Sequence, residues 1–136
     1  MSSISTIALS GMNAAARRLE VSASNVANVM STGALPNADG TVPAGAPQAY
    51  APLELVQTAS AGGGTQTAVT TVTPSTTAVS DPQAPFANQN GLVAAPNVDL
   101  AQELIGQLIA SYSFAANATV MKANDRMTGR LLNITA

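Results

Sequence analysis

The sequence predicts a mainly helical protein with a long helix near each end and a short middle segment of loops and strands. Three observations favour this fold class. Apolar residues recur every three or four positions near both ends. Pro, Gly, Ser and Thr gather between residues 34 and 96, where only three residues are charged. Aromatic residues make up 3% and charged residues 9% of the 136, so a large aromatic core is not expected.

The first segment, residues 1–33, is expected to form one helix. Ser2 or Ser3 can cap its start, and Thr32-Gly33 followed by Pro36 marks its end. Steps of three and four residues place small and apolar side chains on one face, which a partner helix can approach closely. The residues expected to pack there are Ala8, Gly11, Met12, Ala15, Leu19, Val26 and Val29.

The last segment, residues 97–136, is expected to form a second helix of about 37 residues, roughly 55 Å long, with Asn97 as its N-cap. Such a length is typical of a coiled coil, a membrane span or an assembly element. Polar residues on the other faces argue against a membrane span. The expected packing residues are Ile105, Ile109, Tyr112, Ala116, Val120, Ala123, Met127, Leu131 and Ile134.

The middle segment, residues 34–96, is expected to hold a small, two- or three-stranded element. Residues 50–58 and 68–73 have strand character, and Gly62-Gly63-Gly64 would form the loop between them. Asn90-Gly91 predicts another turn before Leu92-Val93. Residues 36–47 are expected to be mobile.

The composition excludes several classes of function. The chain has no Cys and no His, which removes disulfides, Cys or His metal sites, and Ser-His or Cys-His catalysis. A net charge of −2 gives no basis for nucleic acid as the main partner. We therefore expect no catalytic residue, cofactor, metal or small-molecule substrate, and we do not expect an enzyme.

Two motifs that resemble sites have plainer explanations. No Lys-Ser or Lys-Thr pair follows the three glycines at 62–64, so a flexible turn is favoured over a phosphate loop. Asp99 and Glu103 lie one turn apart, where acid–base chemistry is conceivable. Because both lie at the start of the last helix, capping and interaction with the helix dipole are the favoured roles.

The basic residues allow two interpretations. Lys122, Arg126 and Arg130 form a stripe toward the end of the last helix, and Arg17 and Arg18 form a weaker cluster. Cations near a helix C-terminus are favourable, so a solvated face is one reading. A contact with acidic groups on a neighbouring subunit is the other. Periodicity also leaves open whether the apolar faces meet in an internal helix hairpin or in a bundle between subunits.

Both ends of the chain resemble flagellar rod and hook proteins. Residues 8–14 (ALSGMNA) and 24–28 (SNVAN) resemble the N-terminal signature of that family, and residues 97–104 (NVDLAQEL) resemble the start of its C-terminal helix. The middle segment and the short length resemble a proximal rod protein of the family. The motif residues are Asn25, Ala27, Asn28, Gly33, Asn97, Val98, Asp99 and Asn117.

The resemblance implies a structural subunit of a helical tube in the flagellar basal body. Its terminal helices would pair antiparallel, as a coiled-coil-like hairpin near the tube axis, in a rod that crosses the periplasm, transmits torque and encloses the export channel. The subunit would leave the cytoplasm through the flagellar type III export apparatus, without a cleaved signal. Implied partners are further copies, other rod proteins, the basal adaptor protein and the inner-membrane ring. Another proximal rod subunit and an exported surface-binding module remain as alternatives.

Overall fold

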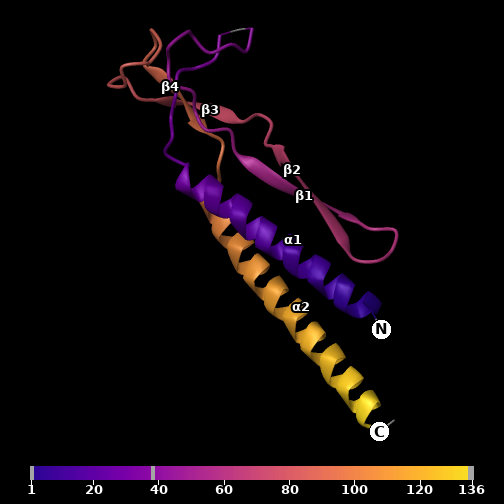
Figure 1. The fold of residues 1–136 in the computed structure, drawn as a ribbon. Coiled ribbons are helices and arrows are strands. Elements are labelled where there is room, and N and C mark those ends of the chain that lie inside the picture. The colour runs from indigo at the N-terminus through magenta and orange to yellow at the C-terminus, as the bar shows by residue number, and fades with distance from the viewer. Residues whose placement is uncertain (1, 38, 135–136) are drawn as a thin grey trace.

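The computed structural model describes residues 2–37 and 39–134, and its helices and strands follow the predicted order (Figure 1). Two helices enclose four strands in the sequence, so the prediction of a mainly helical fold with a β-containing middle is confirmed. The elements are α1 (Ser2–Ala27), β1 (Leu53–Ala59), β2 (Thr65–Thr71), β3 (Thr76–Ser80), β4 (Leu92–Pro96) and α2 (Leu100–Ile134).

The two helices pair antiparallel, so that the start of α1 and the end of α2 lie at the same end of the molecule (Figure 1). Near the start of α1, Asn124 Nδ2 donates to Ser5 Oγ at 2.9 Å. Near its end, Ser22 Oγ donates to the Glu103 carbonyl at 3.1 Å. These bonds fix the register, and the last turns of α2 project beyond the start of α1. Coiled-coil geometry for this pair stays a prediction.

The interface between the helices, called the seam below, is built from small side chains. Ala8, Ala15 and Ala110 are buried. A Cβ atom on Gly11 would lie 2.5 Å from Asn117 Oδ1, so only glycine fits there without moving the asparagine. Small side chains at these positions let the helices come close together, and they keep the apolar area buried within one chain small.

Helix α1 ends at Ala27, six residues before the predicted end at Gly33. The Asn28 side chain donates to the Ser24 carbonyl at 2.9 Å, and this carbonyl belongs to the last turn of the helix. Gly33 instead forms an antiparallel bridge with Ala94. A Cβ on Gly33 would overlap the Ala49 backbone nitrogen, so glycine is required there by a close approach of chain segments and not by a helix end.

Helix α2 is capped by Asp99, and the prediction of Asn97 as its N-cap is wrong. Asp99 Oδ1 accepts hydrogen bonds from the backbone N–H groups of Ala101 and Gln102, at 2.9 and 3.2 Å. Asn97 has other partners, because its side chain donates to the Pro74 carbonyl and its N–H to the Ser75 carbonyl. Asn97 therefore holds residues 74–75, which precede β3, beside the start of α2.

The middle segment forms two separate two-stranded antiparallel sheets, where one element was predicted. β1 pairs with β2 from Leu53↔Thr71 to Ala59↔Thr65, around the glycine loop at 62–64. This hairpin begins later than the predicted strand at residue 50, and its second strand begins earlier than residue 68. β3 was not predicted, and it pairs with β4, which follows the predicted Asn90-Gly91 turn.

The hairpin, α1 and α2 are stacked in that order (Figure 1). Within the described residues, α1 contacts both strands of the β1–β2 hairpin, whereas α2 contacts no helix or strand other than α1. The β3–β4 sheet lies beyond the junction of the helices, where Val93 and Ala94 are fully buried. One side of α2 is therefore left without cover.

Helix α2 is long and apolar enough to cross a membrane, by length and composition alone, between Leu100 and Leu131. A single helix of this length and composition is a weak sign of a membrane span, and other features of the helix favour protein partners. Asn124 and Glu103 hydrogen-bond α1, and Lys122, Arg126 and Arg130 lie on the same helix. We attribute the apolar character of α2 to packing against protein.

Candidate functional site: the helix junction and the outer faces

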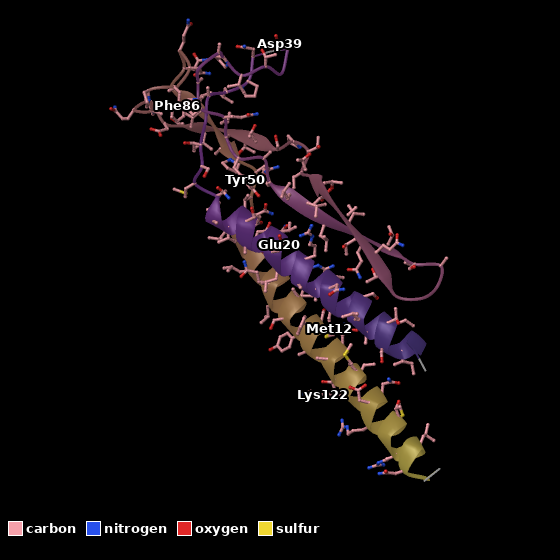
Figure 2. The ribbon with its side chains drawn as sticks, viewed as in Figure 1. Met12, Glu20, Asp39, Tyr50, Phe86 and Lys122 are labelled. Atoms are coloured by element: carbon pink, nitrogen blue, oxygen red, sulfur yellow. The ribbon has the colours of Figure 1, made fainter. Side chains whose placement is uncertain are left out.

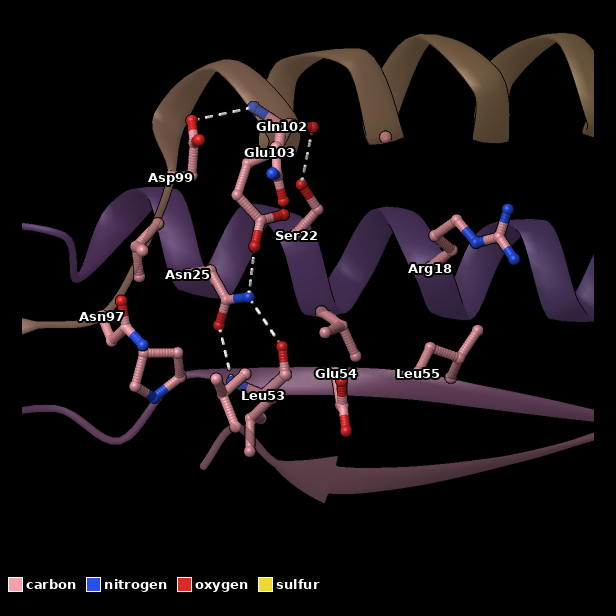
Figure 3. A pocket seen from close by; sticks show the side chains of 15 residues that line it. Arg18, Ser22, Asn25, Leu53, Glu54, Leu55, Asn97, Asp99, Gln102 and Glu103 are labelled. Atoms are coloured by element: carbon pink, nitrogen blue, oxygen red, sulfur yellow. Dashed lines mark hydrogen bonds between the residues drawn. The ribbon is translucent and has the colours of Figure 1, made fainter. Parts of the chain in front are cut away.

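Asn25 joins three elements where the helices meet the middle segment (Figure 3). Its side chain is 1% exposed. Its Nδ2 donates to the Leu53 carbonyl at 2.8 Å and to Glu103 Oε1 at 2.6 Å. Its Oδ1 accepts from the Leu53 N–H at 2.9 Å and from the Tyr50 hydroxyl at 3.0 Å. One amide thus fixes the end of α1, the start of β1 and the first turn of α2.

The partners of Asn25 explain why an asparagine is needed. The amide supplies two N–H donors and an oxygen with two lone pairs, and all four sites are used. Aspartate would lose both donors and would face Glu103. Tyr50, which lies near the end of α1 in Figure 2, also hydrogen-bonds the Ser24 hydroxyl at 3.0 Å. Glu103 was predicted to cap α2, but its carboxylate holds α1 instead.

A groove of about 470 Å³ lies beside this junction, between α1, β1 and the start of α2. Charged side chains from Arg18, Glu54, Asp99 and Glu103 line it (Figure 3). Asp99 and Glu103 are engaged in structural hydrogen bonds. Among the described residues there is no group of three acidic, His or Cys side chains that could hold a metal ion. The groove is therefore explained by the packing of the junction, and its charged side chains serve that packing.

The glycine loop fastens the hairpin to the start of α1. Ser10 Oγ donates to the Ile7 carbonyl at 2.7 Å and accepts from the Thr65 N–H at 3.1 Å. Gly64 has a φ of +84°, and a Cβ there would overlap Ser10 Oγ. The three glycines were interpreted only as a turn, so this contact was missed. At the middle of α1, Arg18 donates to Gln57 Oε1 at 3.1 Å and provides a second link.

The predicted packing residues divide between the seam and the outside. Ala8 and Ala15 are buried in the seam, and Gly11, Met12, Val26, Val29 and Ala123 are partly buried. The others whose side chains are described are exposed, and they are Leu19, Ile105, Ile109, Tyr112, Ala116, Val120, Met127 and Leu131. The Ile134 side chain lies outside the described residues. Most of the predicted α2 face therefore points away from α1.

The residues of α2 that contact α1 in the seam are small or polar, and they are not those of the predicted apolar face. Asn124 and Ala110 are buried there, and Glu103, Ser113 and Asn117 are partly buried. Periodicity identified an apolar face but could not show that a stripe of alanine, serine and asparagine makes the internal contact. The exposed face is consistent with packing between subunits, which stays a prediction.

The basic residues lie in two different surroundings. Arg17 forms an ion pair with Glu20 at 2.7 Å, and both side chains are more than half exposed, so the pair adds little stability. Lys122, Arg126 and Arg130 are exposed on the distal half of α2, where Figure 2 labels Lys122. Arg126 Nε donates to the Lys122 carbonyl at 3.3 Å, a contact within the helix. A subunit contact for these side chains stays a prediction.

One titratable group far from the junction is perturbed. The side-chain hydrogen bond from Thr41, followed by its backbone N–H, lowers the pKa of Asp39. These bonds close a turn within residues 36–47. They concern local loop structure and not the helix pair.

Comparison with known families identifies both ends of the chain. A family model described as "Flagella basal body rod protein" matches residues 6–34. A second, described as "Flagellar basal body rod FlgEFG protein C-terminal", matches residues 89–134. Asn25 and Glu103, which meet at the junction, each fall within one of the matched ranges.

Curated relatives match nearly the whole chain. The flagellar basal-body rod protein FlgC of Buchnera aphidicola subsp. Acyrthosiphon pisum is 31% identical over 131 residues, covering 96% of this chain and 95% of the relative. FlgC of Salmonella typhimurium strain LT2 and FlgC of Escherichia coli O6:H1 are each 32% identical over 128 residues, covering 94% of this chain and 92% of the relative. The chain belongs to the FlgC-like family of flagellar basal-body rod proteins. It is a structural subunit of the flagellar rod.

Rod-family membership confirms the resemblance of the two terminal motifs, and the structure gives some of the motif residues a physical role. Asn25 forms the junction, Asn28 closes α1, Gly33 allows a close backbone approach, and Asp99 caps α2. Asn117 packs against Gly11 and donates to the Ser113 carbonyl at 2.8 Å. Sequence reasoning missed Tyr50 and Glu103 as partners of Asn25, because a hydrogen bond between residues distant in sequence leaves no periodic signal.

Proposed function

We propose that this rod protein is a proximal rod subunit that assembles helically, transmits motor torque and helps to enclose the export channel. The observation that carries the proposal is the exposed apolar side of α2. That helix pairs with α1 through small and polar residues, while large apolar residues remain exposed. An assembly in which neighbouring subunits cover this side removes the apolar surface from water.

In this proposal, the helical core comprises residues 1–33 and 97–136, and residues 34–96 form the middle segment. The two helices form a coiled-coil-like hairpin that packs near the tube axis. The middle segment lies toward neighbours or the outer surface. The antiparallel register set by Ser5–Asn124 and Ser22–Glu103 supports a hairpin that acts as one rigid unit.

The proposed partners are further copies of the chain, other rod proteins, the basal adaptor protein and the inner-membrane ring. The rod would cross the periplasm, and the subunit would reach it through the flagellar type III export apparatus without a cleaved signal peptide. The match to FlgC relatives over more than nine-tenths of their length supports this placement. It does not favour another proximal rod subunit or an exported surface-binding module.

Mass spectrometry of purified hook–basal bodies tests the proposal, together with antibody labelling under the electron microscope. We expect the chain to be present, with its unprocessed N-terminal peptide, and the label to fall on the rod near the inner-membrane ring. Label elsewhere along the axis would overturn the proximal position. Absence of the chain from intact basal bodies would overturn the rod assignment in this organism.

A further inference from the structure

Five large apolar side chains form a ridge on the outer side of α2. They are Leu104, Ile105, Leu108, Ile109 and Tyr112, and they are 54%, 59%, 56%, 48% and 69% exposed. No charged residue occurs between Glu103 and Lys122, so the ridge and its flanks are uncharged over 18 residues. Exposed isoleucine, leucine and tyrosine at this density are unusual for a surface that faces water alone.

A groove of about 270 Å³ lies along one side of the seam, between α1 and α2. Its lining is apolar apart from one hydroxyl, and consists of Ala15, Ala16, Leu19, Ala110, Ser111 and Phe114. Its two buried residues, Ala15 and Ala110, are small, whereas Leu19 and Phe114 are each nearly half exposed, so the lining is lowest at the alanines. A protruding aliphatic side chain matches such a recess in shape and polarity.

The ridge of a chain cannot enter the groove of the same chain. Three of the groove residues, Ala110, Ser111 and Phe114, lie on the same continuous helix as the ridge. A straight helix cannot fold its residues 104–112 onto its residues 110–114. A contact between a ridge and a groove of this kind therefore takes two molecules.

We propose that the α2 ridge of one copy of this chain docks into the α1–α2 groove of the next copy. This inference rests on the proposed function, and it names the surfaces through which copies meet. Ridge and groove are different surfaces, so the contact is heterologous: each copy uses its ridge on one neighbour and its groove on another. Such contacts propagate, as a helical rod requires, whereas a ridge-to-ridge contact would close into a dimer.

The area is consistent with a contact that needs an assembly to persist. At roughly 100 Å² for each half-exposed side chain, the ridge presents on the order of 500 Å², compared with ~800 Å² per partner in a standard stable interface. A single ridge–groove pair is therefore weak, and the contact strengthens when several neighbours act together. Because neither surface is charged, salt should screen the association little.

Cysteine cross-linking tests the geometry, because the chain contains no native cysteine. Ala16→Cys places a thiol in the groove, and Ile105→Cys places one on the ridge; both positions are exposed. The test uses concentrated full-length protein and basal bodies from cells that co-express the two variants. We expect disulfide-linked dimers when the variants are mixed and little cross-linking of either variant alone. Efficient cross-linking of Ile105→Cys with itself would show a ridge-to-ridge contact and overturn the proposal.

A matched pair of substitutions tests the energetics. Leu108→Ser removes an exposed apolar side chain from the ridge, and Val56→Ser removes one from β1, away from ridge and groove. In sedimentation equilibrium of the full chain, we expect self-association to weaken about tenfold for Leu108→Ser and less than about twofold for Val56→Ser. Equal effects would overturn the proposal.

These experiments separate the inference from the proposed function. If wild-type chain is found in basal bodies but the 16–105 cross-link does not form there, the ridge–groove contact is wrong and the rod assignment stands. If the cross-link forms in solution but the chain is absent from basal bodies, the proximal-rod proposal fails while the contact between copies stands.

Discussion

Asn25 and Glu103 are separated by 78 positions in the sequence, yet the Asn25 amide donates to the Glu103 carboxylate at 2.6 Å. This bond connects the last turns of α1 to the first turn of α2. Because Asn25 also holds both backbone groups of Leu53, the bond fixes the direction in which the chain leaves the helix pair.

Asn25→Ala should destabilise the monomer by about 3 kcal/mol, because it leaves the Leu53 N–H and carbonyl without a partner in a buried site. Urea unfolding of the monomer measures the effect. Asn28→Ala is a matched control, since the Asn28 side chain bonds neighbours in sequence: it donates to the Ser24 carbonyl and accepts from the Ser31 hydroxyl. This variant should lose about 1 kcal/mol or less. Equal losses of unfolding free energy in the two variants would show that the Asn25 hydrogen bonds do not contribute more than an ordinary helix-end bond.

Asn25→Asp should be destabilised at neutral pH, because a second carboxylate would face Glu103. Glu103→Gln in the same chain should restore a large part of the loss, since the new amide can donate to the carboxylate introduced at position 25. A double-mutant cycle measures this coupling, which we expect to be about 1–2 kcal/mol. Additive effects would mean that the two side chains act independently.

Gly11→Leu should separate the helices and lower the monomer's unfolding free energy by about 2 kcal/mol, because a side chain at Gly11 meets Asn117. Gly129→Leu is the matched control, because Gly129 also lies in a helix, α2, but no atom lies within 4 Å of a Cβ at that position. It should leave stability unchanged or raise it by a few tenths of a kcal/mol through helix propensity. Thermal unfolding of both variants, with motility as a second readout for Gly11→Leu, decides the matter.

Gly64→Ala should loosen the β1–β2 hairpin and cost about 1–2 kcal/mol, because its φ of +84° and its contact with Ser10 both oppose a side chain. Gly62→Ala should be nearly neutral, since nothing lies within 4 Å of that position and its φ is not in the left-handed region. Gly63→Ala, at a φ of +89°, should also be costly. NMR chemical shifts of β1 and β2 would report the loosening of the hairpin. Equal shift changes in all three variants would contradict the special role of the positive-φ glycines.

Hydrogen exchange in dilute monomer should divide α2 into two parts. Amides near Ala110, opposite α1, should be protected, whereas those of residues 129–131, beyond the start of α1, should exchange within seconds to minutes. Assembled rods should protect both parts if neighbours cover the distal end. Full protection of the distal amides in the monomer would contradict the view that this end needs a partner.

The sequence predicted what depends on local patterns. The two helices, the glycine-loop hairpin and the turn before Leu92 all follow from periodicity or from residues with strong local preferences. The N-cap of α2 was placed at Asn97, two residues before Asp99, which caps the helix in the structure. Gly33 shows the limit of such reasoning. It resembles a helix stop, but its role depends on the backbone of Ala49, which a one-dimensional pattern cannot place.

The internal face of α2 was harder to predict for a related reason. Periodicity selects large apolar residues, such as Ile105 and Tyr112, and these remain exposed. The seam uses Ala110 and Asn124, because a close helix approach needs small side chains and its register is fixed by individual hydrogen bonds. Which face meets α1 is set by contacts between residues distant in sequence. The sequence reveals the outer face because its residues are apolar, but the pattern of one chain cannot identify what the face contacts.

The alanine-rich seam has a consequence for the life of a single subunit. Ala8, Ala15 and Ala110 bury little area, so the free chain holds together weakly and unfolds without breaking a large core. In the proposed rod, the larger apolar side chains on α2 would be buried only after neighbours arrive. Under the proposed function, such a chain would pass unfolded through a narrow channel at little cost and would resist removal once neighbours surround it. The lifetime of its folded state would then depend more on its position in the rod than on its own small core.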